Sequence, residues 1–426
     1  MRTPLIAIAM ATFVHVGVAQ QPITTLGDTL RLSRADAVAR ALAANPTIEI
    51  AGALAAQARA RRTQASAIPD PVGSADWEQG RGLFGAGGPT TRSLSATLTI
   101  PFPDKLRLQR RIGTGDVRSA EADSVLGRQI TAALTSQAYD ALIAALRRQD
   151  DLREIGGLAD EFVARTRGRL EAGTAARLDV LKAEVDAGQA TNDLITAERD
   201  IVNARTSLNR LLDRALDAPI VPSDSLYVPG ELPGLESLLA VATVRRPELA
   251  SLASQQDGAK AASRLAKEFW LPDITFGVGR DRADPGPGVL TTGISMPIPI
   301  FYWQHARGEI AESRSREREL DATARDLRAA IGEEVRSLYA ATDAAIRQAR
   351  FLDQQLLPAA REAHRIATDS YALGGSSALE VLDARRSLLD AERQAVDALL
   401  DANATRAELE RAVATPLSTL GSGVQP

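Results

Sequence analysis

The sequence predicts a mainly α-helical protein with a small β part, organised as two copies of one long unit. The first observation behind this prediction is a repeated motif: Leu170–Ala183 (LEAGTAARLDVLKA) returns as Tyr371–Ala384 (YALGGSSALEVLDA) at an offset of 201 residues. The second is an alanine-rich stretch without proline, from Asp104 to about Ala172, in which apolar residues recur every three or four positions. Because internal repeats of this length indicate duplicated architectures, we expect a symmetric assembly rather than a catalytic domain.

The expected organisation along the chain follows from this repeat. It comprises a signal peptide over residues 1–19, a first structural repeat over 20–218, a connector over 219–234, a second structural repeat over 235–414 and a tail over 415–426. The signal peptide is expected because Arg2 precedes an apolar run from Leu5 to Val18, and Ala19 suits a signal peptidase.

The sequence contains no cysteine. An exported chain without cysteine has no disulfide framework and is not expected to be a lipoprotein, because acylation requires a cysteine at the mature N-terminus. No run of 18 apolar residues follows the signal segment, so no helix is expected to span a membrane. Two classes remain open at this point: a soluble periplasmic protein and a β-barrel.

The first repeat is expected to begin with a helix. Ser33 and Asp36 form a capping-box signature, and the helix that they start should run to about Ala67 with an interruption at Asn45-Pro46. Between residues 72 and 100 the sequence indicates a strand, a glycine-rich loop and a second strand.

Two long helices should complete this repeat. The first, from Asp104 to about Ala172, would extend about 100 Å at about 1.5 Å per residue, longer than globular domains usually contain. The second should run from about Leu178 to Asp213 after a turn at Gly173. Its apolar residues alternate at spacings of three and four, which is typical of a helix that packs lengthwise against a neighbour. They are Leu194, Ala197, Ile201, Ala204, Leu208 and Leu211.

The second repeat should follow the same plan. The expected elements are a helix over about Leu235–Phe269, strands over Ile274–Arg280 and Val289–Met296, a long helix over about Gln304–Ala372, a turn at Gly374 and a helix from Ala378 to about Ala414. Pro358 lies in the second long helix where Gly156 and Gly157 lie in the first. We therefore expect both long helices to bend or loosen at these positions.

Aromatic residues are few and gather around the four strand segments. Nine of the sixteen lie in or beside these segments, which favours strand ends at a membrane interface. The alternative is ordinary aromatic packing where helices meet strands. Four strands cannot close a barrel, so a membrane-spanning sheet would require several copies of the chain. The expected interface aromatics are Trp77, Phe102, Trp270, Phe301, Tyr302 and Trp303.

With these motifs, the chain resembles the TolC family of outer-membrane factors, the exit ducts of tripartite efflux pumps and of type I secretion. The resemblance covers the mature chain and is most specific at the two turn motifs around Gly173 and Gly374. It implies a homotrimer in the outer membrane. Each protomer would give four strands to a twelve-stranded transmembrane β-barrel, and its duplicated long-helix hairpins would form an α-helical barrel through the periplasm.

The resemblance also implies roles for the helix tips. In the family these turns receive a periplasmic adaptor protein, and the residues carried over for this contact are Gly173, Leu178, Gly374 and Leu379. Glycine suits a tight interhelical turn because it adopts positive φ without strain. A plain helix-turn glycine without a partner is the alternative.

Family members also close the tip with carboxylates, and the matching positions here are Asp179, Glu380 and Asp383. In a trimer each position would form a ring of three like charges that selects cations. Acidic residues also favour the first turn of any helix, and Ser377 with Glu380 is itself a capping box. The periplasmic gate and the capping role therefore both stay open.

A further question is how the tips are held closed. Some relatives carry a basic latch residue where this chain has Ser376, so the latch is expected to be absent or to use another partner such as Arg177 or Arg385. Lys182 occupies the first-repeat position of Asp383, which makes the two kinds of tip electrostatically unequal.

Residues for catalysis, cofactors and metals are scarce. The formal net charge is −4, which gives no electrostatic case for nucleic acid. No Gly-Lys dipeptide occurs, which excludes a Walker A phosphate loop. The mature chain has two histidines, His305 and His364, one methionine and no cysteine, which leaves little capacity to bind a soft metal. We therefore expect no enzyme, no cofactor and no metal site.

The preferred function is a passive outer-membrane exit duct. The expected partners are further copies of the chain, a periplasmic adaptor, an energised inner-membrane pump and outer-membrane lipid. The short tail after Ala414 and the Pro69-Asp70-Pro71 segment resemble the heavy-metal efflux branch, whose pumps are of the resistance-nodulation-division type. Two alternatives remain open: the outer-membrane component of type I protein secretion and a soluble periplasmic coiled-coil scaffold.

Overall fold

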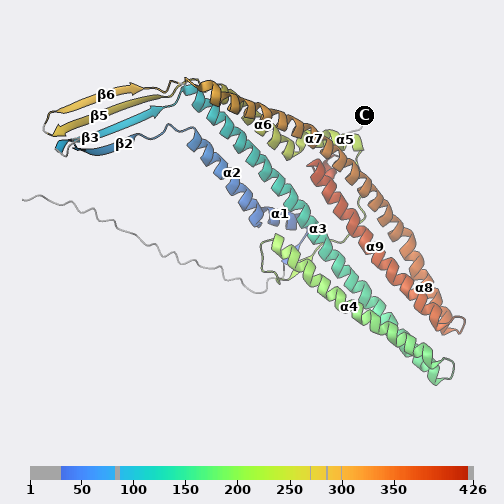
Figure 1. The fold of residues 1–426 in the computed structure, drawn as a ribbon. Coiled ribbons are helices and arrows are strands. Elements are labelled where there is room, and N and C mark those ends of the chain that lie inside the picture. The colour runs from blue at the N-terminus through green and yellow to red at the C-terminus, as the bar shows by residue number, and fades with distance from the viewer. Residues whose placement is uncertain (1–29, 82–86, 269, 285, 299, 421–426) are drawn as a thin grey trace, which may run out of the picture.

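Helices dominate the computed structural model, which describes residues 30–420 except 82–86, 269, 285 and 299. A four-stranded sheet lies at one end, and the helices extend from it as a long body whose tips lie at the opposite end (Figure 1). The predicted mainly α fold with a small β part is thus confirmed. The predicted signal peptide, residues 1–19, lies outside the described residues.

Two short helices, α1 (Arg34–Ala44) and α2 (Pro46–Ala65), lead toward the sheet. The predicted capping box is confirmed: the Asp36 backbone N–H donates to Ser33 Oγ at 3.1 Å, and the Ser33 N–H donates to the Asp36 carboxylate at 3.2 Å. The predicted interruption is confirmed as well, because Asn45 ends α1 and its side chain caps α2.

The large sheet is antiparallel. It contains β2 (Val72–Arg81), β3 (Gly87–Ile100), β5 (Ile274–Asp284) and β6 (Gly288–Ser295), in that spatial order. The central pairing joins β3 to β5 and therefore joins the two halves of the chain. β2 and β6 form the edges of the sheet within one chain. Residues 82–86 of the predicted glycine-rich loop lie outside the described residues.

A pair of long helices follows the first hairpin. α3 (Pro103–Glu171) is a single helix of 69 residues, about 100 Å long at about 1.5 Å per residue. α3 is continuous through Gly156 and Gly157, so the predicted loosening of the helix there is wrong. Glycine keeps its N–H and costs a helix only about 1 kcal/mol relative to alanine. α4 (Arg177–Leu211) packs along α3, and every residue of its predicted apolar stripe is buried or half-buried.

The second half repeats the helical plan. It contains α5 (Leu235–Arg245), α6 (Pro247–Lys267), α7 (Tyr302–Phe351), α8 (Leu357–Ala372) and α9 (Ala378–Val413), and a short 3-10 turn (Leu417–Thr419) follows α9. A π-helical turn at Leu352–Leu356 joins α7 to α8, so the predicted loosening near Pro358 is confirmed. Proline has no N–H for the carbonyl four residues earlier, and a wider turn accommodates that loss.

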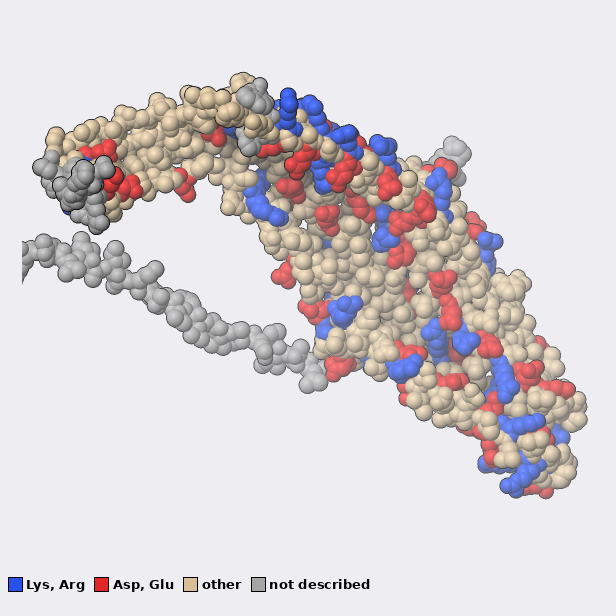
Figure 2. Space-filling view, in the orientation of Figure 1, with Lys and Arg blue, Asp and Glu red and all other residues tan. Residues whose placement is uncertain are grey.

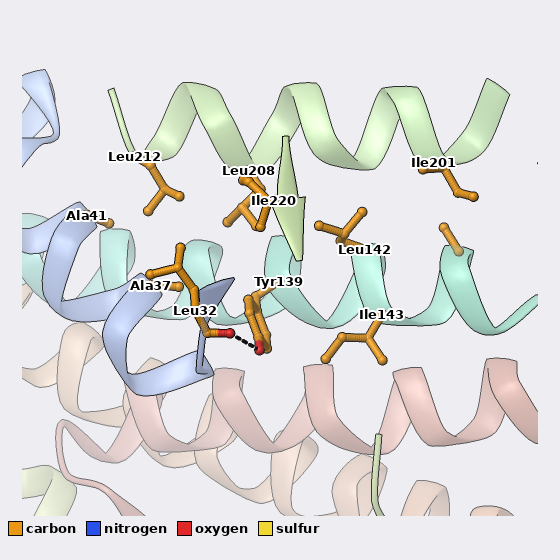
Figure 3. Close-up of a cluster of buried hydrophobic side chains, with 11 residues drawn as sticks. Leu32, Ala37, Ala41, Tyr139, Leu142, Ile143, Ile201, Leu208, Leu212 and Ile220 are labelled. Carbon is orange, nitrogen blue, oxygen red and sulfur yellow. Dashed lines mark hydrogen bonds between the residues drawn. The ribbon is translucent and has the colours of Figure 1, made fainter. Parts of the chain in front are cut away.

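A second, two-stranded sheet was not predicted. β1 (Leu30–Leu32) pairs in parallel with β4 (Ile220–Pro222), which lies in the segment predicted as a connector. Tyr139 on α3 anchors the pair, because its hydroxyl donates to the Leu32 carbonyl at 2.7 Å. Figure 3 shows the core around this contact, where side chains of α1, α3, α4 and both strands meet.

A buried ion pair lies close to this core. Arg34 Nε donates to Asp140 Oδ1 at 2.9 Å, and the Asp140 side chain is only 2% exposed. Burial raises the pKa of Asp140 to about 6, and the Arg34 guanidinium limits the increase. Burial alone would lower the pKa of Arg34, but its contacts with Asp140 and Tyr227 raise it overall. The pair is therefore attractive, while burial still penalises the carboxylate.

The raised pKa of Asp140 predicts a pH dependence of stability. Asp140 binds a proton more readily in the folded chain than in the unfolded chain. Its protonation therefore stabilises the fold below about pH 4, and this stabilisation is lost as the pH rises through about 6. A difference of about two pKa units corresponds to about 3 kcal/mol. Asp140→Asn should flatten the change in thermal midpoint between about pH 4 and about pH 7.

Asp160→Asn, an exposed change on the same helix, serves as the control and should keep the profile of the unmodified chain. Parallel profiles for Asp140→Asn and the unmodified chain would contradict the assignment of this pH dependence to Asp140.

Candidate functional site

The two helix tips turn on glycines in the left-handed region. Gly173 has φ 77° and Gly374 has φ 83°. Each turn is closed by backbone hydrogen bonds, such as Thr174 N–H to the Arg169 carbonyl at 2.8 Å and its counterpart, Gly375 N–H to the Ser370 carbonyl at 2.8 Å. A Cβ added at Gly173 or Gly374 would meet nothing within 4 Å, so the positive φ rather than crowding requires glycine.

The tip carboxylates cap the returning helices. The Ala176 N–H donates to Asp179 Oδ2 at 3.3 Å, and the Ser377 N–H donates to Glu380 Oε2 at 3.0 Å. Ser377 Oγ accepts from the Glu380 N–H at 3.3 Å, which completes the capping box. Asp383 lies one turn further along α9 and is exposed. The structure thus gives Asp179 and Glu380 a capping role, and their role in a gate remains a prediction.

Large apolar side chains are exposed at the tips. Leu178 and Leu379 are each 58% exposed, at the starts of α4 and α9. Leu373, directly before Gly374, is 89% exposed and was missed by sequence reasoning. The sequence could have indicated it, because Leu373 stands at a helix end where the first repeat has the small residue Ala172. Three large apolar side chains exposed at the two tips form the kind of surface that another protein could cover.

A buried contact joins the two hairpins just behind the tips. Arg385 on α9 forms an ion pair with Asp186 on α4, and the two side chains are only 7% and 8% exposed. Of the two arginines considered as latch candidates, Arg385 thus joins the hairpins. Ser376 Oγ instead donates to the Ala367 carbonyl at 3.0 Å within its own hairpin. We call the Arg385–Asp186 pair the hairpin lock.

Tyr371 adds a second contact between the hairpins. Arg169 Nη1 donates to the Tyr371 carbonyl at 2.5 Å, and the Arg169 guanidinium lies 4.4 Å from the centre of the Tyr371 ring. The same ring packs against Phe162 on α3 with a centroid distance of 5.2 Å. Polar and apolar contacts therefore both hold α8 and α9 against α3 and α4 near the tip.

At the other end of the molecule, strand register separates two faces of the large sheet. Residues that pair directly lie on the same face, and Phe276 pairs with Leu98 on one side and Ile294 on the other. We call this the apolar face. Its apolar members are Ala75, Trp77, Leu94, Ala96, Leu98, Ile100, Ile274, Phe276, Val278, Leu290 and Ile294.

The opposite face, which we call the polar face, consists mainly of Ser, Thr, Gly and Asp. Its hydroxyls pair across strands: Ser74 and Ser95 Oγ lie 2.7 Å apart, and Thr99 and Thr275 Oγ1 lie 2.9 Å apart. Figure 2 shows few charges on the visible surface of the sheet, whereas charges of both signs cover the helices. Alternation of this kind over most of the strand length is the pattern of transmembrane barrel strands.

Aromatic residues mark both ends of the apolar face. Trp77 is 73% exposed near the end far from the helices, while Phe102, Trp270 and Phe301 lie at the helix end with exposures of 38%, 60% and 61%. Trp77 pairs with Arg92, and Phe102 lies ten positions after Arg92, just beyond the end of β3. At about 3.3 Å per residue and the usual strand tilt, this separation spans about 25 Å across a membrane. This height matches the apolar band of outer-membrane barrels.

The side chains of Tyr302 and Trp303, also expected at the interface, lie outside the described part of the chain. Within the described residues, no helix is both long and apolar enough for a membrane span. The same residues contain no group of three His, Cys, Asp or Glu side chains suited to a metal ion.

The fold and the two-faced sheet define the class of an outer-membrane channel protein, and comparisons with known proteins agree. The family model for outer membrane efflux proteins matches residues 37–214 and again residues 238–415. The chain belongs to this family. The second match begins and ends 201 residues after the first, which is the offset of the two tip motifs.

Curated relatives include the cobalt-zinc-cadmium resistance protein CzcC of Cupriavidus metallidurans, 24% identical over 71% of this chain and 72% of the relative. The pyoverdine export outer membrane protein OpmQ of Pseudomonas aeruginosa is 28% identical over 71% of this chain and 65% of the relative.

Among solved structures, CusC has a TM-score of 0.78 at 19% identity and covers 89% of this chain and 91% of its own. The MtrE outer membrane channel of Neisseria gonorrhoeae has a TM-score of 0.75 at 20% identity, and the match covers 90% of this chain and 89% of MtrE. These likenesses show the fold. With the family match, they make the chain an outer-membrane efflux channel of tripartite pumps that extends into the periplasm.

Proposed function

We propose that three copies of the chain form one continuous exit duct. The observation that carries this proposal is the four-stranded sheet with an apolar and a polar face, whose edges β2 and β6 are unpaired within one chain. Backbone groups at a sheet edge cannot be left unpaired in lipid, and four strands are too few to close. Three copies give a closed barrel of twelve strands, with the apolar face toward lipid and the polar face toward the lumen.

The duct conducts passively, and we propose that its energy comes from an inner-membrane pump. The names of the relatives support export: they include resistance to cobalt, zinc, cadmium and nickel, and export of pyoverdine. We propose the heavy-metal efflux branch with a pump of the resistance-nodulation-division type. Deletion of this gene should then sensitise its host to cobalt, zinc or cadmium. Loss of a secreted protein without metal sensitivity would instead favour type I secretion.

We further propose that the exposed tips receive a periplasmic adaptor. Gly173 and Gly374 shape the turns, and Leu178, Leu379 and Leu373 offer the apolar contacts. Burial of each leucine against a partner would contribute about 1.5–3 kcal/mol. The tip carboxylates Asp179, Glu380 and Asp383 are proposed to form the gate, as rings of like charge around the closed end of the duct.

The adaptor contact can be tested with charged leucine variants. Leu178→Glu combined with Leu379→Glu should reduce co-purification of the adaptor by about tenfold or more and abolish efflux, because a charge replaces the apolar contact. Val244→Glu, an equally polar change at a site 82% exposed on α5, should preserve both. Unchanged adaptor binding by the double variant would contradict the proposed contact, provided that its trimer assembles.

A further inference from the structure

Three arginines lie at the end of the apolar face that is far from the helices. Arg92 on β3 and Arg282 on β5 are directly paired, and Arg280 lies two residues from Arg282 on the same face. All three side chains are exposed. The residues next to them toward the helices are apolar: Leu94 pairs with Arg280 and follows Arg92 on this face.

Space left by a glycine brings the third guanidinium toward the other two. Gly288 on β6 pairs with Arg282, and Arg280 Nε lies only 3.4 Å from the place that a Cβ on Gly288 would occupy. The Arg280 side chain thus extends across Gly288 to the level of Arg282 and Arg92. Trp77 pairs with Arg92 at the same level.

The three arginines have no ion-pair partner among the described side chains. Described carboxylates on the neighbouring strands lie beyond ion-pair distance of them, and the side chain of Asp284, next on this face, lies outside the described part. Like charges directly opposite each other on a sheet are destabilising. An anion bound between them would remove that repulsion, and guanidinium groups bind phosphate through paired hydrogen bonds.

We propose that Arg92, Arg280 and Arg282 bind the phosphate groups of lipid in the outer leaflet of the membrane. The inference rests on the proposed orientation of the apolar face toward lipid. The helices extend into the periplasm from the opposite end of the sheet (Figure 1). The end that carries the arginines therefore lies at the outer surface of the membrane. Lipid chains would cover the apolar face beneath, and Trp77 and the arginines, which lie at one level, would meet the interface and its headgroup phosphates.

Free phosphate could contact only the arginines, whereas a phosphorylated lipid contacts both the arginines and the apolar face. A lipid should therefore bind more tightly than free phosphate. The same geometry predicts that salt weakens binding, since exposed charges are screened. The three copies of the cluster would place a ring of lipid phosphates around the outer rim of the barrel.

The test uses the full-length trimer in neutral detergent with three probes: diphosphorylated lipid A, the same lipid without its phosphates, and inorganic phosphate. We expect the phosphorylated lipid alone to bind tightly. Arg92→Gln, Arg280→Gln and Arg282→Gln together should weaken its binding at least about tenfold. The matched control replaces three exposed arginines of α7, Arg314, Arg325 and Arg350, with Gln and should leave binding unchanged.

Equal binding by the triple variant and the unmodified trimer would overturn the proposal, as would equal binding of the phosphorylated and phosphate-free lipids. Tight binding of inorganic phosphate would overturn it too. Recovery of a heat-modifiable trimer from the outer-membrane fraction is measured on the same preparations. Failure of lipid binding in a trimer that assembles in the membrane therefore rejects the arginine site and leaves the duct intact.

Discussion

Phe276→Arg should prevent the trimer from accumulating in the outer membrane, whereas Thr97→Arg should be tolerated. Phe276 lies near the middle of the apolar face, opposite Leu98, and is 42% exposed in one chain. An arginine that faces lipid at the membrane midplane costs about 2–4 kcal/mol, and every trimer would contain three. Thr97 is the matched control, because it lies one position along β3 from Leu98 and pairs with Gly277 on the polar face.

The measurement is the amount of heat-modifiable trimer in the outer-membrane fraction for both variants. Loss of the trimer with Phe276→Arg and its retention with Thr97→Arg would support the assignment of the two faces. Equal recovery of both variants would show that the apolar face does not meet lipid.

Breaking the hairpin lock should have the second large effect. Arg385→Leu leaves Asp186 buried without its partner, and removal of one member of a buried ion pair costs about 3–5 kcal/mol. The loss should appear as faster hydrogen exchange in α4 and α9 near the tip and as a lower thermal midpoint. Arg365→Leu, which breaks exposed pairs with Glu362 and Asp369 on the same hairpin, should change neither measurement.

A double variant separates loss of the lock from poor folding. Asp186→Leu combined with Arg385→Met replaces the pair with apolar groups and should recover much of the stability. A thermal midpoint no higher than that of Arg385→Leu would contradict the account of the lock.

Conductance in planar bilayers extends the same test to the gate. Arg385→Leu should raise conductance, because the two hairpins separate more easily, and should keep cation selectivity.

Glu380→Ala with Asp383→Ala should lower cation selectivity, since the rings of negative charge are lost. Unchanged selectivity in this variant would leave Glu380 with only its capping role.

Local features of the fold were predictable from the sequence. Ser33, Asn45 and Pro358 act within a few residues of their own position, so the cap, the interruption and the loosened helix follow from residue type. Gly156 and Gly157 misled the prediction because glycine only weakens a helix. The outcome there depends on packing along α3, which local sequence does not encode.

Long-range partners could not be predicted. Residues 30–32 and 220–222 form a sheet across 190 positions, and the three-residue strands carry no recognisable period. Asp186 gave no sign that it pairs with Arg385, because only the packing of α4 against α9 brings them together. The arginine cluster likewise depends on the register of β3, β5 and β6, which a sequence pattern alone does not fix.

The most direct test of the duct uses the natural absence of cysteine, since each single-cysteine variant then reports one position. Cysteines would replace Leu98, Phe276 and Ile294 on the apolar face and, in separate variants, Thr97, Thr275 and Ser295 on the polar face. A membrane-impermeant maleimide added to intact cells should label the three polar-face positions, which line a water-filled lumen, and spare the apolar-face positions in lipid. Equal labelling of both faces, as in a sheet surrounded by water, would contradict a membrane-spanning duct.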